Sequence, residues 1–258
     1  MTDRADNVPA ASRSGADAAL ASVAGIEGWL SDGQARRLFA AGRAVPAGGR
    51  ALEIGSYRGR SAIVLAQAVP ADAEVVAVDP HAGNDRGPQQ IDGTPDEGQD
   101  DNEAFRANLR RTGVADRVRH VRRPSTDAHD AVEGQLDLLY VDGAHRYVPA
   151  RDDIAHWGAR VRTGGTMLIH DAFSSVGVTG AQARLLLASR RWRYLGRSRS
   201  MAEYRREDLG LAASVGSAVR QLAQLPWFAR NLVVKAAIVA GLDPVARLLG
   251  HREGPWPY

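Results

Sequence analysis

Polar residues with chemically active side chains follow two apolar runs in the second half of the chain. Asp142 follows the first run, and His170 and Asp171 follow the second. If these runs are neighbouring parallel strands, their ends lie about 5 Å apart, within reach of one shared cation. A polar cluster there is costly unless it binds something. The spacing therefore predicts a metal site of two carboxylates and one imidazole; the alternative is a cluster that only hydrogen-bonds internally.

His145 lies three residues after Asp142, so we expect it on the same loop and over the same cleft. An imidazole is available in its neutral form near physiological pH, as a general base requires. The alternative is a histidine that only caps the following helix. We predict that His145 is the catalytic base.

A second candidate site is the stretch Glu53-Ile54-Gly55-Ser56-Tyr57-Arg58-Gly59, which reads as a tight turn after a buried strand. Gly55 can adopt a positive φ and let a ligand approach the backbone, and Gly59 lets the next helix pack closely. Dinucleotide sites use G-x-G-x-x-G instead, and Glu53 is unfavourable near a pyrophosphate. Glu53 suits a cationic ligand, such as the ammonium group of an amino acid. The alternative is a turn without a ligand.

Asp79 ends the next apolar run, at about the distance from the first glycine expected of an acid that binds ribose hydroxyls. Ligands of open α/β sheets bind at the carboxyl ends of the strands, so Asp79 belongs to the same edge as the residues above. Its alternative role is to cap the following turn.

Apolar runs and helical patterns alternate along the middle of the chain, which indicates a parallel sheet with helices on both faces. Two final runs, Trp192–Gly196 and Ser200–Arg205, are so close that we expect an antiparallel hairpin at one edge. The predicted fold is α/β: a Rossmann-like, doubly wound, mostly parallel sheet with a C-terminal hairpin and helical extensions at both ends. The other predicted strands are Arg50–Ile54, Glu74–Asp79, Arg117–Val121, Leu136–Asp142 and Thr166–His170. The predicted helices of this region are Arg60–Val69, Asn102–Thr112, Thr126–Glu133, Pro149–Ala159 and Gly180–Ser189.

The chain divides into residues 1–48, 49–207 and 208–258. The first part is predicted to hold a disordered start, Met1–Ala24, and a helical cap, Ile26–Ala41. The middle part holds the sheet, interrupted by His81–Asp101, which is poor in apolar residues; we predict a structureless lid there, with plain disorder as the alternative. The last part is predicted to be helical over Leu209–Leu225, Trp227–Leu242 and Pro244–Leu249.

The C-terminal helices carry an apolar stripe with three possible fates. It can pack on the sheet domain, form a subunit interface, or lie on a membrane surface with Arg230, Lys235, Arg247 and Arg252 at the headgroups. We favour packing or an interface, because apolar helical stripes are usually buried in protein. We therefore expect a homo-oligomer.

The turn Glu53–Gly59 resembles the first motif of the class I S-adenosylmethionine (SAM) methyltransferases, acidic-x-Gly-x-x-x-Gly. A parallel sheet completed by a hairpin is also their architecture. Asp142-Gly143-Ala144-His145, followed by His170-Asp171, resembles the metal-dependent branch of macrolide-sugar and cephalosporin-type O-methyltransferases. The resemblance covers about Gly49 to Glu207, and Asp-Gly-Ala-His is its most specific part.

The resemblance implies a SAM site, with Ser125 beside the adenine, and a metal with His145 as base. Asp142 and Asp171 match the branch's magnesium ligands, whereas His170 replaces a carboxylate. Since magnesium prefers oxygen and imidazole suits softer metals, we expect Mg or Mn at Asp142, His170 and Asp171, with a metal-free site as the alternative. The implied cofactor-binding residues are Glu53, Gly55, Ser56, Tyr57, Gly59, Ser61, Asp79, Ser125 and Asp142.

Composition narrows the function. The chain has no cysteine, which excludes disulfides and thiolate sites, and its net charge of +3 is too small to indicate nucleic acid. No signal sequence or spanning run is visible, so we expect a cytoplasmic protein. The expected function is O-methylation of a small hydroxylated acceptor, a sugar or glycosylated natural product by the resemblance. The alternatives are a metal-free methyltransferase and a non-catalytic SAM-binding scaffold that associates through its C-terminal helices.

Overall fold

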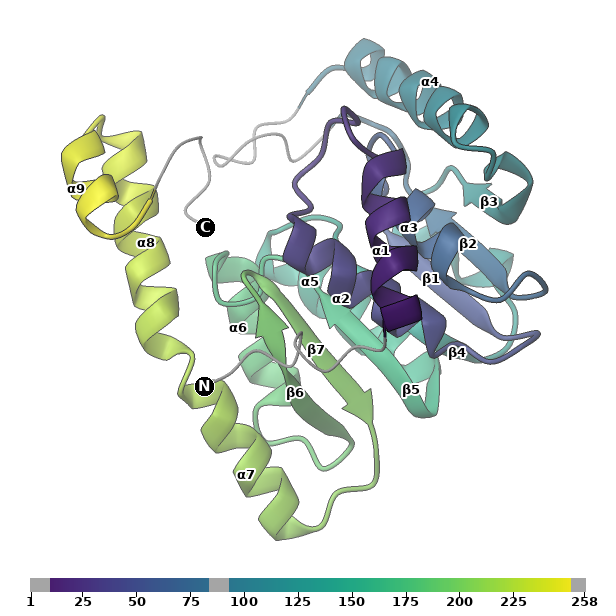
Figure 1. Ribbon diagram of the computed structural model, residues 1–258. Helices are drawn as coiled ribbons and strands as arrows, with labels where there is room; N and C mark the ends of the chain where they lie inside the picture. The colour runs from purple at the N-terminus through teal and green to yellow at the C-terminus, as the bar shows by residue number, and fades with distance from the viewer. Residues whose placement is uncertain (1–9, 84–92, 252–258) are drawn as a thin grey trace.

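The structure is a computed structural model that describes residues 10–83 and 93–251, and its centre is a seven-stranded sheet (Figure 1). The strand order is β3-β2-β1-β4-β5-β7-β6, with β1 to β5 parallel and β7 antiparallel to both of its neighbours. The predicted fold class is confirmed. The strands are β1 (Arg50–Ile54), β2 (Glu74–Val78), β3 (Val118–Val121), β4 (Leu136–Val141), β5 (Val161–Ile169), β6 (Trp192–Ser198) and β7 (Met201–Arg206).

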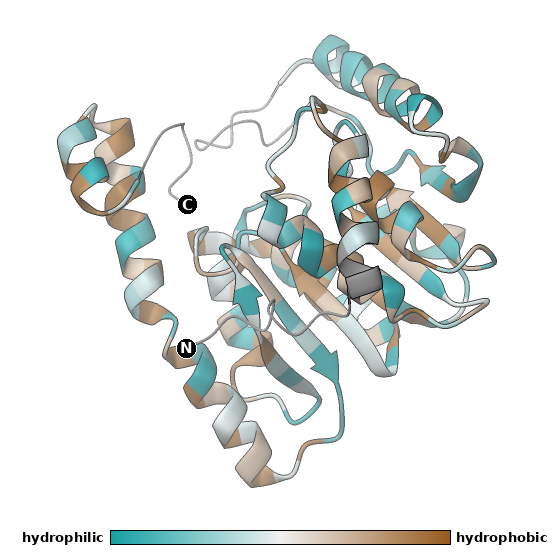
Figure 2. Cartoon of the chain, in the orientation of Figure 1, coloured by the Kyte–Doolittle hydropathy of each residue, from teal (hydrophilic) through white to brown (hydrophobic). Residues whose placement is uncertain are grey.

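Helices cover both faces of the sheet, and successive residues of a central strand enter opposite cores. On β1, Ala51 joins the core beneath α2 and α3, whereas Leu52 joins the core that contains Trp157. Both faces of such strands are buried, so β1 and β4 are largely hydrophobic (Figure 2). The helices are α1 (Ala10–Ser22), α2 (Asp32–Arg43), α3 (Arg60–Ala68), α4 (Pro95–Arg111), α5 (Tyr147–Asp152), α6 (Val176–Leu186), α7 (Leu211–Leu222), α8 (Leu225–Val239) and α9 (Asp243–Leu248).

The N-terminal part differs from the prediction. The predicted disordered start contains α1, which buries Ala16 and Ala19 against the domain. Residues 1–9 lie outside the described part of the chain. The predicted helix from Ile26 begins only at Asp32, because Ser31 caps α2 in a capping box with Gln34.

The predicted structureless lid, His81–Asp101, is helical from Pro95 onward. Thr94 and Glu97 form a capping box around Pro95, and these caps start α4 seven residues before the predicted helix. Residues 84–92 of the lid lie outside the described part. The predicted helix Thr126–Glu133 is wrong: the segment contains two short 3₁₀ turns, Ser125–Asp127 and His129–Ala131.

The C-terminal helices begin and end close to the predicted positions. The break between α7 and α8 lies at residues 223–224, and Pro226 falls in the first turn of α8, where proline is tolerated. Across the described ranges, 10–83 and 93–251, no helix is both long enough and apolar enough for a membrane span.

Candidate active site

The ends of four parallel strands line up along one edge of the sheet. Ile54 pairs with Val78 on β2 and with Val141 on β4, and Val141 pairs with Ile169 on β5. The residues that follow the four strands therefore lie side by side. They are Gly55, Asp79, Asp142 and His170.

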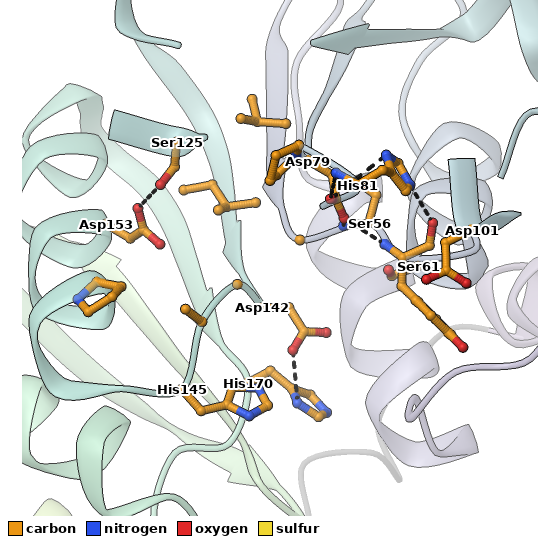
Figure 3. Close-up of a pocket in the computed structure, with 18 of the residues that line it drawn as sticks. Ser56, Ser61, Asp79, His81, Asp101, Ser125, Asp142, His145, Asp153 and His170 are labelled. Atoms are coloured by element: carbon orange, nitrogen blue, oxygen red, sulfur yellow. Dashed lines mark hydrogen bonds and ion pairs between the residues drawn. The ribbon is translucent and has the colours of Figure 1, made fainter. Parts of the chain in front are cut away.

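A pocket of about 450 Å³ opens over this edge (Figure 3). Glu27, Trp29 and Leu30 of the predicted N-terminal cap also line it, although they were not among the predicted site residues. Of the predicted site residues, Glu53 and Gly59 do not line the pocket. Those that do are Gly55, Ser56, Tyr57, Ser61, Asp79, Ser125, Asp142, His145, His170 and Asp171.

The two glycines of the turn have separate structural roles. Gly55 has a φ of 84°, and a Cβ atom built there would lie 2.1 Å from the backbone oxygen of Asp142. The close approach at Gly55 is therefore made by the backbone that follows β4. Gly59 caps α3 with a φ of 87° and faces the Phe105 ring of α4 rather than the strand.

The Asp79 side chain binds backbone amides of the glycine turn. One carboxylate oxygen accepts hydrogen bonds from the amides of Ser56 (2.7 Å) and Tyr57 (2.9 Å), and the other accepts from the His81 amide (2.7 Å). Carboxylates that accept amide bonds are strongly oriented. The oxygen that accepts only from His81 has a further lone-pair direction, so Asp79 can also accept a hydroxyl from a ligand in the pocket.

Glu53 is fully buried just below the turn. Within the described part of the chain, neither of its carboxylate oxygens has a well-formed hydrogen bond. Burial raises the pKa of Glu53 to about 8, against a smaller lowering effect from the Ser61 and Ser56 hydroxyls. A buried acid without firm partners favours the approach of a proton or a cationic group.

The N-terminal segment is tied to the turn by a small network. The Trp29 ring stacks on Tyr57 with centroids 5.2 Å apart, and the Tyr57 hydroxyl donates to Glu27 at 3.0 Å. Arg58 bridges Glu27 to the buried Asp101 on α4. The sequence separates these residues widely, so no local pattern reveals the network.

Ser125 lies across the pocket from the turn, and its hydroxyl donates to Asp153 at 2.5 Å. Burial raises the pKa of Asp153 to about 6. Asp153 begins a π-helical turn, Asp153–Trp157, and such turns are frequent at functional sites. Asp153 was not among the predicted site residues, because its surroundings, Pro149–Ala159, have the pattern of an ordinary helix.

Asp142 lies between a tyrosine and a histidine. The Tyr140 hydroxyl donates to one Asp142 oxygen at 2.7 Å, and His170 Nδ1 lies 3.1 Å from the other. Burial raises the pKa of Tyr140 well above its ordinary value, so its hydroxyl remains a donor. His170 Nδ1 is also 3.6 Å from Asp171, and one candidate ligand atom from each of Asp142, His170 and Asp171 lies within 4.8 Å of the others.

Gln34 determines which nitrogen of His170 carries a proton. The Gln34 oxygen accepts from the backbone amide (2.9 Å) and hydroxyl (2.8 Å) of Ser31, and its nitrogen lies 3.1 Å from His170 Nε2. A backbone N–H can only donate, so the Gln34 oxygen must face Ser31 and its NH₂ group must face His170. Nε2 of His170 therefore accepts, and the proton lies on Nδ1, towards the two carboxylates.

The two neighbouring carboxylates favour a positively charged His170, whereas the Gln34 contact opposes the second proton that this charge requires. Burial lowers the pKa of His170, but Asp142 and Asp171 outweigh burial and raise it well above its ordinary value. The carboxylates thus retain the Nδ1 proton, whereas the Gln34 NH₂ group opposes a second proton on Nε2. His170 Nδ1 faces Asp142 and Asp171, so its proton can be donated to either carboxylate.

His145 and Asp171 form the second imidazole–carboxylate pair, with His145 Nε2 2.9 Å from Asp171 Oδ2. Burial lowers the pKa of His145, but the Asp171 charge outweighs burial and raises it. Burial raises the pKa of Asp171, and the two histidines reverse this effect and hold it well below its ordinary value. An ionised Asp171 that accepts from Nε2 leaves the Nδ1 lone pair of His145 to take a proton.

Comparisons with known proteins agree with this geometry. Residues 52–172 match the sequence family described as "Methyltransferase domain". The cofactor-bound structure of Rv0187 from MTB shares 21% identity over 77% of this chain and 89% of that chain, with a TM-score of 0.52. The O-methyltransferase NovP shares 19% identity over 69% of this chain and 81% of that chain, with a TM-score of 0.55.

A third structure is that of the O-methyltransferase TomG from Streptomyces achromogenes, which is involved in tomaymycin synthesis and was solved with SAM. It shares 19% identity over 78% of this chain and 91% of that chain, with a TM-score of 0.50. At these identities the likeness shows the fold alone. Residues 52–172 therefore match a methyltransferase domain, and the chain shares the Rossmann-like fold of these solved structures.

Proposed function

We propose that this protein transfers the methyl group of SAM to a hydroxyl of a small acceptor. The observation that carries the proposal is that one pocket contains both the glycine turn at Gly55 and the His145–Asp171 pair. A cofactor on the turn and a hydroxyl beside the base would then meet in one cavity. We assign the turn, Asp79 and Ser125 to the cofactor, with Glu53 acting from below the turn.

In the proposed reaction the acceptor oxygen attacks the methyl carbon in line with the leaving sulfur. An O–CH₃ bond forms, and the S–CH₃ bond breaks with its electron pair passing to the sulfonium sulfur. His145 takes the hydroxyl proton on Nδ1 while Nε2–H remains bonded to Asp171. Asp171 stabilises the imidazolium that forms, because its charge already favours protonated His145.

A divalent cation fits part of the predicted donor set. The carboxylates of Asp142 and Asp171 are ligands that Mg²⁺ prefers, and Mn²⁺ also accepts them. His170 fits as a ligand only if its proton leaves Nδ1, which the Gln34 contact opposes. We therefore propose that Asp142 and Asp171 hold the cation and that His170 donates to them. Such a cation would lower the pKa of an acceptor hydroxyl.

The same geometry favours a second candidate, metal-free methyl transfer. The Nδ1–H of His170 already places a positive hydrogen between Asp142 and Asp171, where a cation would otherwise neutralise them. Activity that survives complete removal of divalent metals would support this candidate. A sugar or glycosylated natural product remains our proposed acceptor, because the Asp142–His145 motif resembles enzymes that act on such molecules.

The base assignment predicts separable effects on binding and turnover. His145→Ala removes only the proton acceptor, so calorimetry should show SAM affinity unchanged. Turnover should fall by about 10²- to 10⁴-fold, the usual cost of a lost general base. Wild-type kcat/KM should rise with pH through a pKa above that of free histidine, because the deprotonated imidazole is the active form.

His156→Ala is the matched control, since this exposed histidine does not line the pocket. Near-normal turnover in His145→Ala with the true acceptor would assign the base to another residue. If wild-type protein binds no SAM in the same titration, the cofactor assignment itself fails.

A further inference from the structure

Helix α7 turns its polar face towards the protein. Ser214, Ser217 and Gln221 are buried, and each makes a specific hydrogen bond to the domain. Ser217 accepts from the Tyr194 amide at 2.9 Å, Ser214 donates to the Ser189 carbonyl at 3.1 Å, and Gln221 accepts from the Tyr204 hydroxyl at 2.9 Å. These bonds fix the rotation of α7 about its own axis.

The opposite face of α7 is apolar and faces solvent. Its residues follow one another at helical spacing, and the same stripe continues onto α8 (Figure 2). The α7 part of the stripe therefore does not pack on the sheet domain, whereas Trp227 and Phe228 of α8 do. The exposed fractions are 70% for Leu211, 53% for Val215, 58% for Val219, 46% for Leu222, 47% for Leu225 and 50% for Val233.

Helix α8 keeps the stripe pointing outward. Asn231, on its buried face, donates to the Phe173 carbonyl at 3.0 Å, and Val234 packs with Ala237 and with Ala246 of α9. Figure 1 shows α7 and α8 along the β6 side of the molecule, with α9 folded back on α8. An exposed apolar stripe held in place by specific polar bonds marks an interaction surface.

Charge indicates what covers the stripe. Residues 184–258 contain 13 Arg and Lys against five Asp and Glu, whereas residues 1–183 contain 20 against 25. No acidic residue occurs between Asp208 and Asp243, while Arg220 and Lys235 lie on the two helices. A symmetric contact with a second copy would bring these cations together without acids to pair them. A surface that is both apolar and negatively charged complements them.

We propose that α7 and α8 dock this protein on an anionic lipid bilayer. The apolar stripe enters the boundary between headgroups and acyl chains, and the surrounding cations contact phosphate and carboxylate headgroups. The helices lie in the membrane plane rather than across it. This proposal does not depend on the acceptor or on the metal.

The test uses the full chain and sedimentation with phosphatidylcholine vesicles, with and without phosphatidylglycerol. Wild-type protein should bind the anionic vesicles, and binding should weaken at high salt and on neutral vesicles. The double variant Val215→Glu/Val219→Glu should bind the anionic vesicles at least about tenfold more weakly than wild type, because two apolar side chains no longer enter the bilayer. Both positions are exposed, so the variant should fold normally, which circular dichroism checks.

Val176→Glu is the control: it makes the same chemical change at an exposed valine on α6, outside the stripe, and should leave vesicle binding unchanged. Equal binding by the double variant and wild type would overturn the proposal, as would equal binding to neutral and anionic vesicles. So would a wild-type dimer that the double variant converts to a monomer without any vesicle binding. Light scattering measures that last outcome and would assign the stripe to a second copy.

Discussion

Two histidines in the pocket contact the same Asp171 carboxylate but differ in the nitrogen that remains available. His145 donates from Nε2, which lies 2.9 Å from Asp171, and keeps a lone pair on Nδ1. His170 donates from Nδ1, because Gln34 occupies its Nε2. One imidazole can therefore accept a proton from an acceptor hydroxyl, and the other serves to position the carboxylates.

The role of Gln34 predicts the protonation of His170. In wild-type protein, ¹⁵N NMR should show His170 Nε2 as an unprotonated acceptor and Nδ1 as protonated. Gln34→Glu replaces the facing NH₂ group by a carboxylate oxygen, so Nε2 should become protonated, either in the other neutral tautomer or in the imidazolium.

Ser200→Ala is the control, since Ser200 Oγ lies 3.0 Å from the same Gln34 nitrogen. It should leave the His170 spectrum unchanged. A proton on Nε2 in the wild type would contradict the assignment and return His170 to the set of metal ligands.

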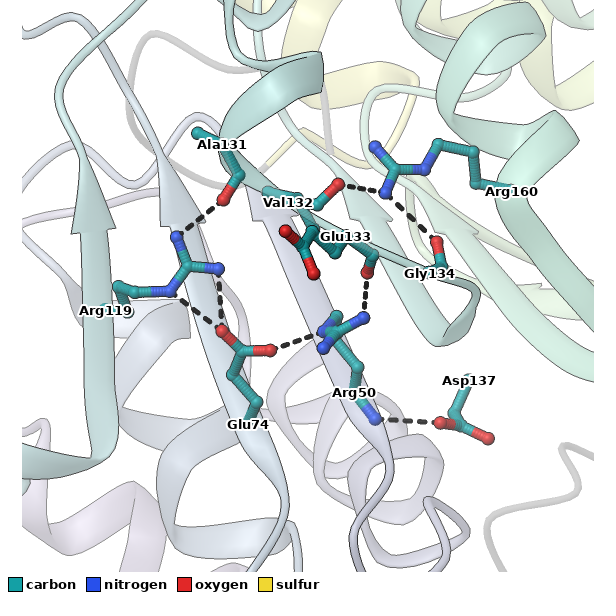
Figure 4. A network of polar contacts seen from close by, with 9 residues as sticks. All are labelled: Arg50, Glu74, Arg119, Ala131, Val132, Glu133, Gly134, Asp137 and Arg160. Atoms are coloured by element: carbon teal, nitrogen blue, oxygen red, sulfur yellow. Dashed lines mark hydrogen bonds and ion pairs between the residues drawn. The ribbon is translucent and has the colours of Figure 1, made fainter.

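At the scale of elements, polar contacts connect the amino-terminal ends of the strands, at the edge of the sheet opposite the pocket (Figure 4). Arg50 on β1 and Arg119 on β3 both pair with Glu74 on β2, and the Arg50 amide donates to Asp137 on β4 at 2.8 Å. Such partly exposed pairs contribute little stability individually. They do connect neighbouring strands in the register that aligns Gly55, Asp79 and Asp142 at the other edge.

The strands and their end residues could be predicted from the sequence, because an apolar run followed by Asp or Gly is a local pattern. The same locality explains the failures. Gln34 and His170 are 136 residues apart, so no spacing rule connects them. The start of helix α4 is predicted too late because it depends on the Thr94–Glu97 caps rather than on apolar residues. The segment after Ser125 has helix-forming composition but is taken up by two short turns.

The turn after β1 predicts a steep cost for a single methyl group. In Gly55→Ala the new Cβ would meet the Asp142 backbone oxygen and the residue would keep a positive φ, so unfolding free energy should fall by about 3 kcal/mol or more. Urea unfolding measures the loss, and SAM affinity should fall with it.

Gly48→Ala is the matched control. Gly48 also has a positive φ, of 66°, but a Cβ atom built there would meet no atom within 4 Å in the described part of the chain. Gly48→Ala should lower the free energy of unfolding only by the cost of a positive φ at a residue with a side chain, about 1–2 kcal/mol. Equal losses in the two variants would mean that the backbone directly after β4 moves away freely, and that Gly55 is needed for its φ alone.

At the scale of the whole molecule, the predicted domain bounds at residues 48 and 208 remain predictions. The N-terminal extension contacts the site, and the C-terminal extension contacts the backbone beside it. Gln34 from the N-terminal part touches His170, and Asn231 from the C-terminal part bonds Phe173, two residues after Asp171. Asp171 and Phe173 both have positive φ values, of 53° and 56°, and such backbone persists only where its surroundings hold it. The sheet domain alone therefore lacks part of the support of its own pocket.

The buried Glu53 predicts how the stability of the whole chain depends on pH. The folded chain keeps a proton on Glu53 up to about pH 8, whereas the unfolded chain loses it near pH 4.5. The folded state thus binds more protons between these values, and the Glu53 contribution to stability falls as pH rises through this window. Glu53→Gln removes the ionisable group. Urea unfolding at several pH values should show that the free energy of unfolding of the variant rises relative to that of wild type from pH 4.5 to 8, by at most about 5 kcal/mol.

Asp153→Asn provides an internal comparison, because the pKa of Asp153 is raised only to about 6. The free energy of unfolding of Asp153→Asn relative to wild type should begin to rise near pH 3.8 and level off near pH 6. That of Glu53→Gln should continue to rise to about pH 8. A pH-independent difference between Glu53→Gln and wild type would mean that Glu53 is ionised in the folded chain at neutral pH. The carboxylate would then already have a positive partner in the folded protein, and Glu53 should contribute little to the affinity for SAM.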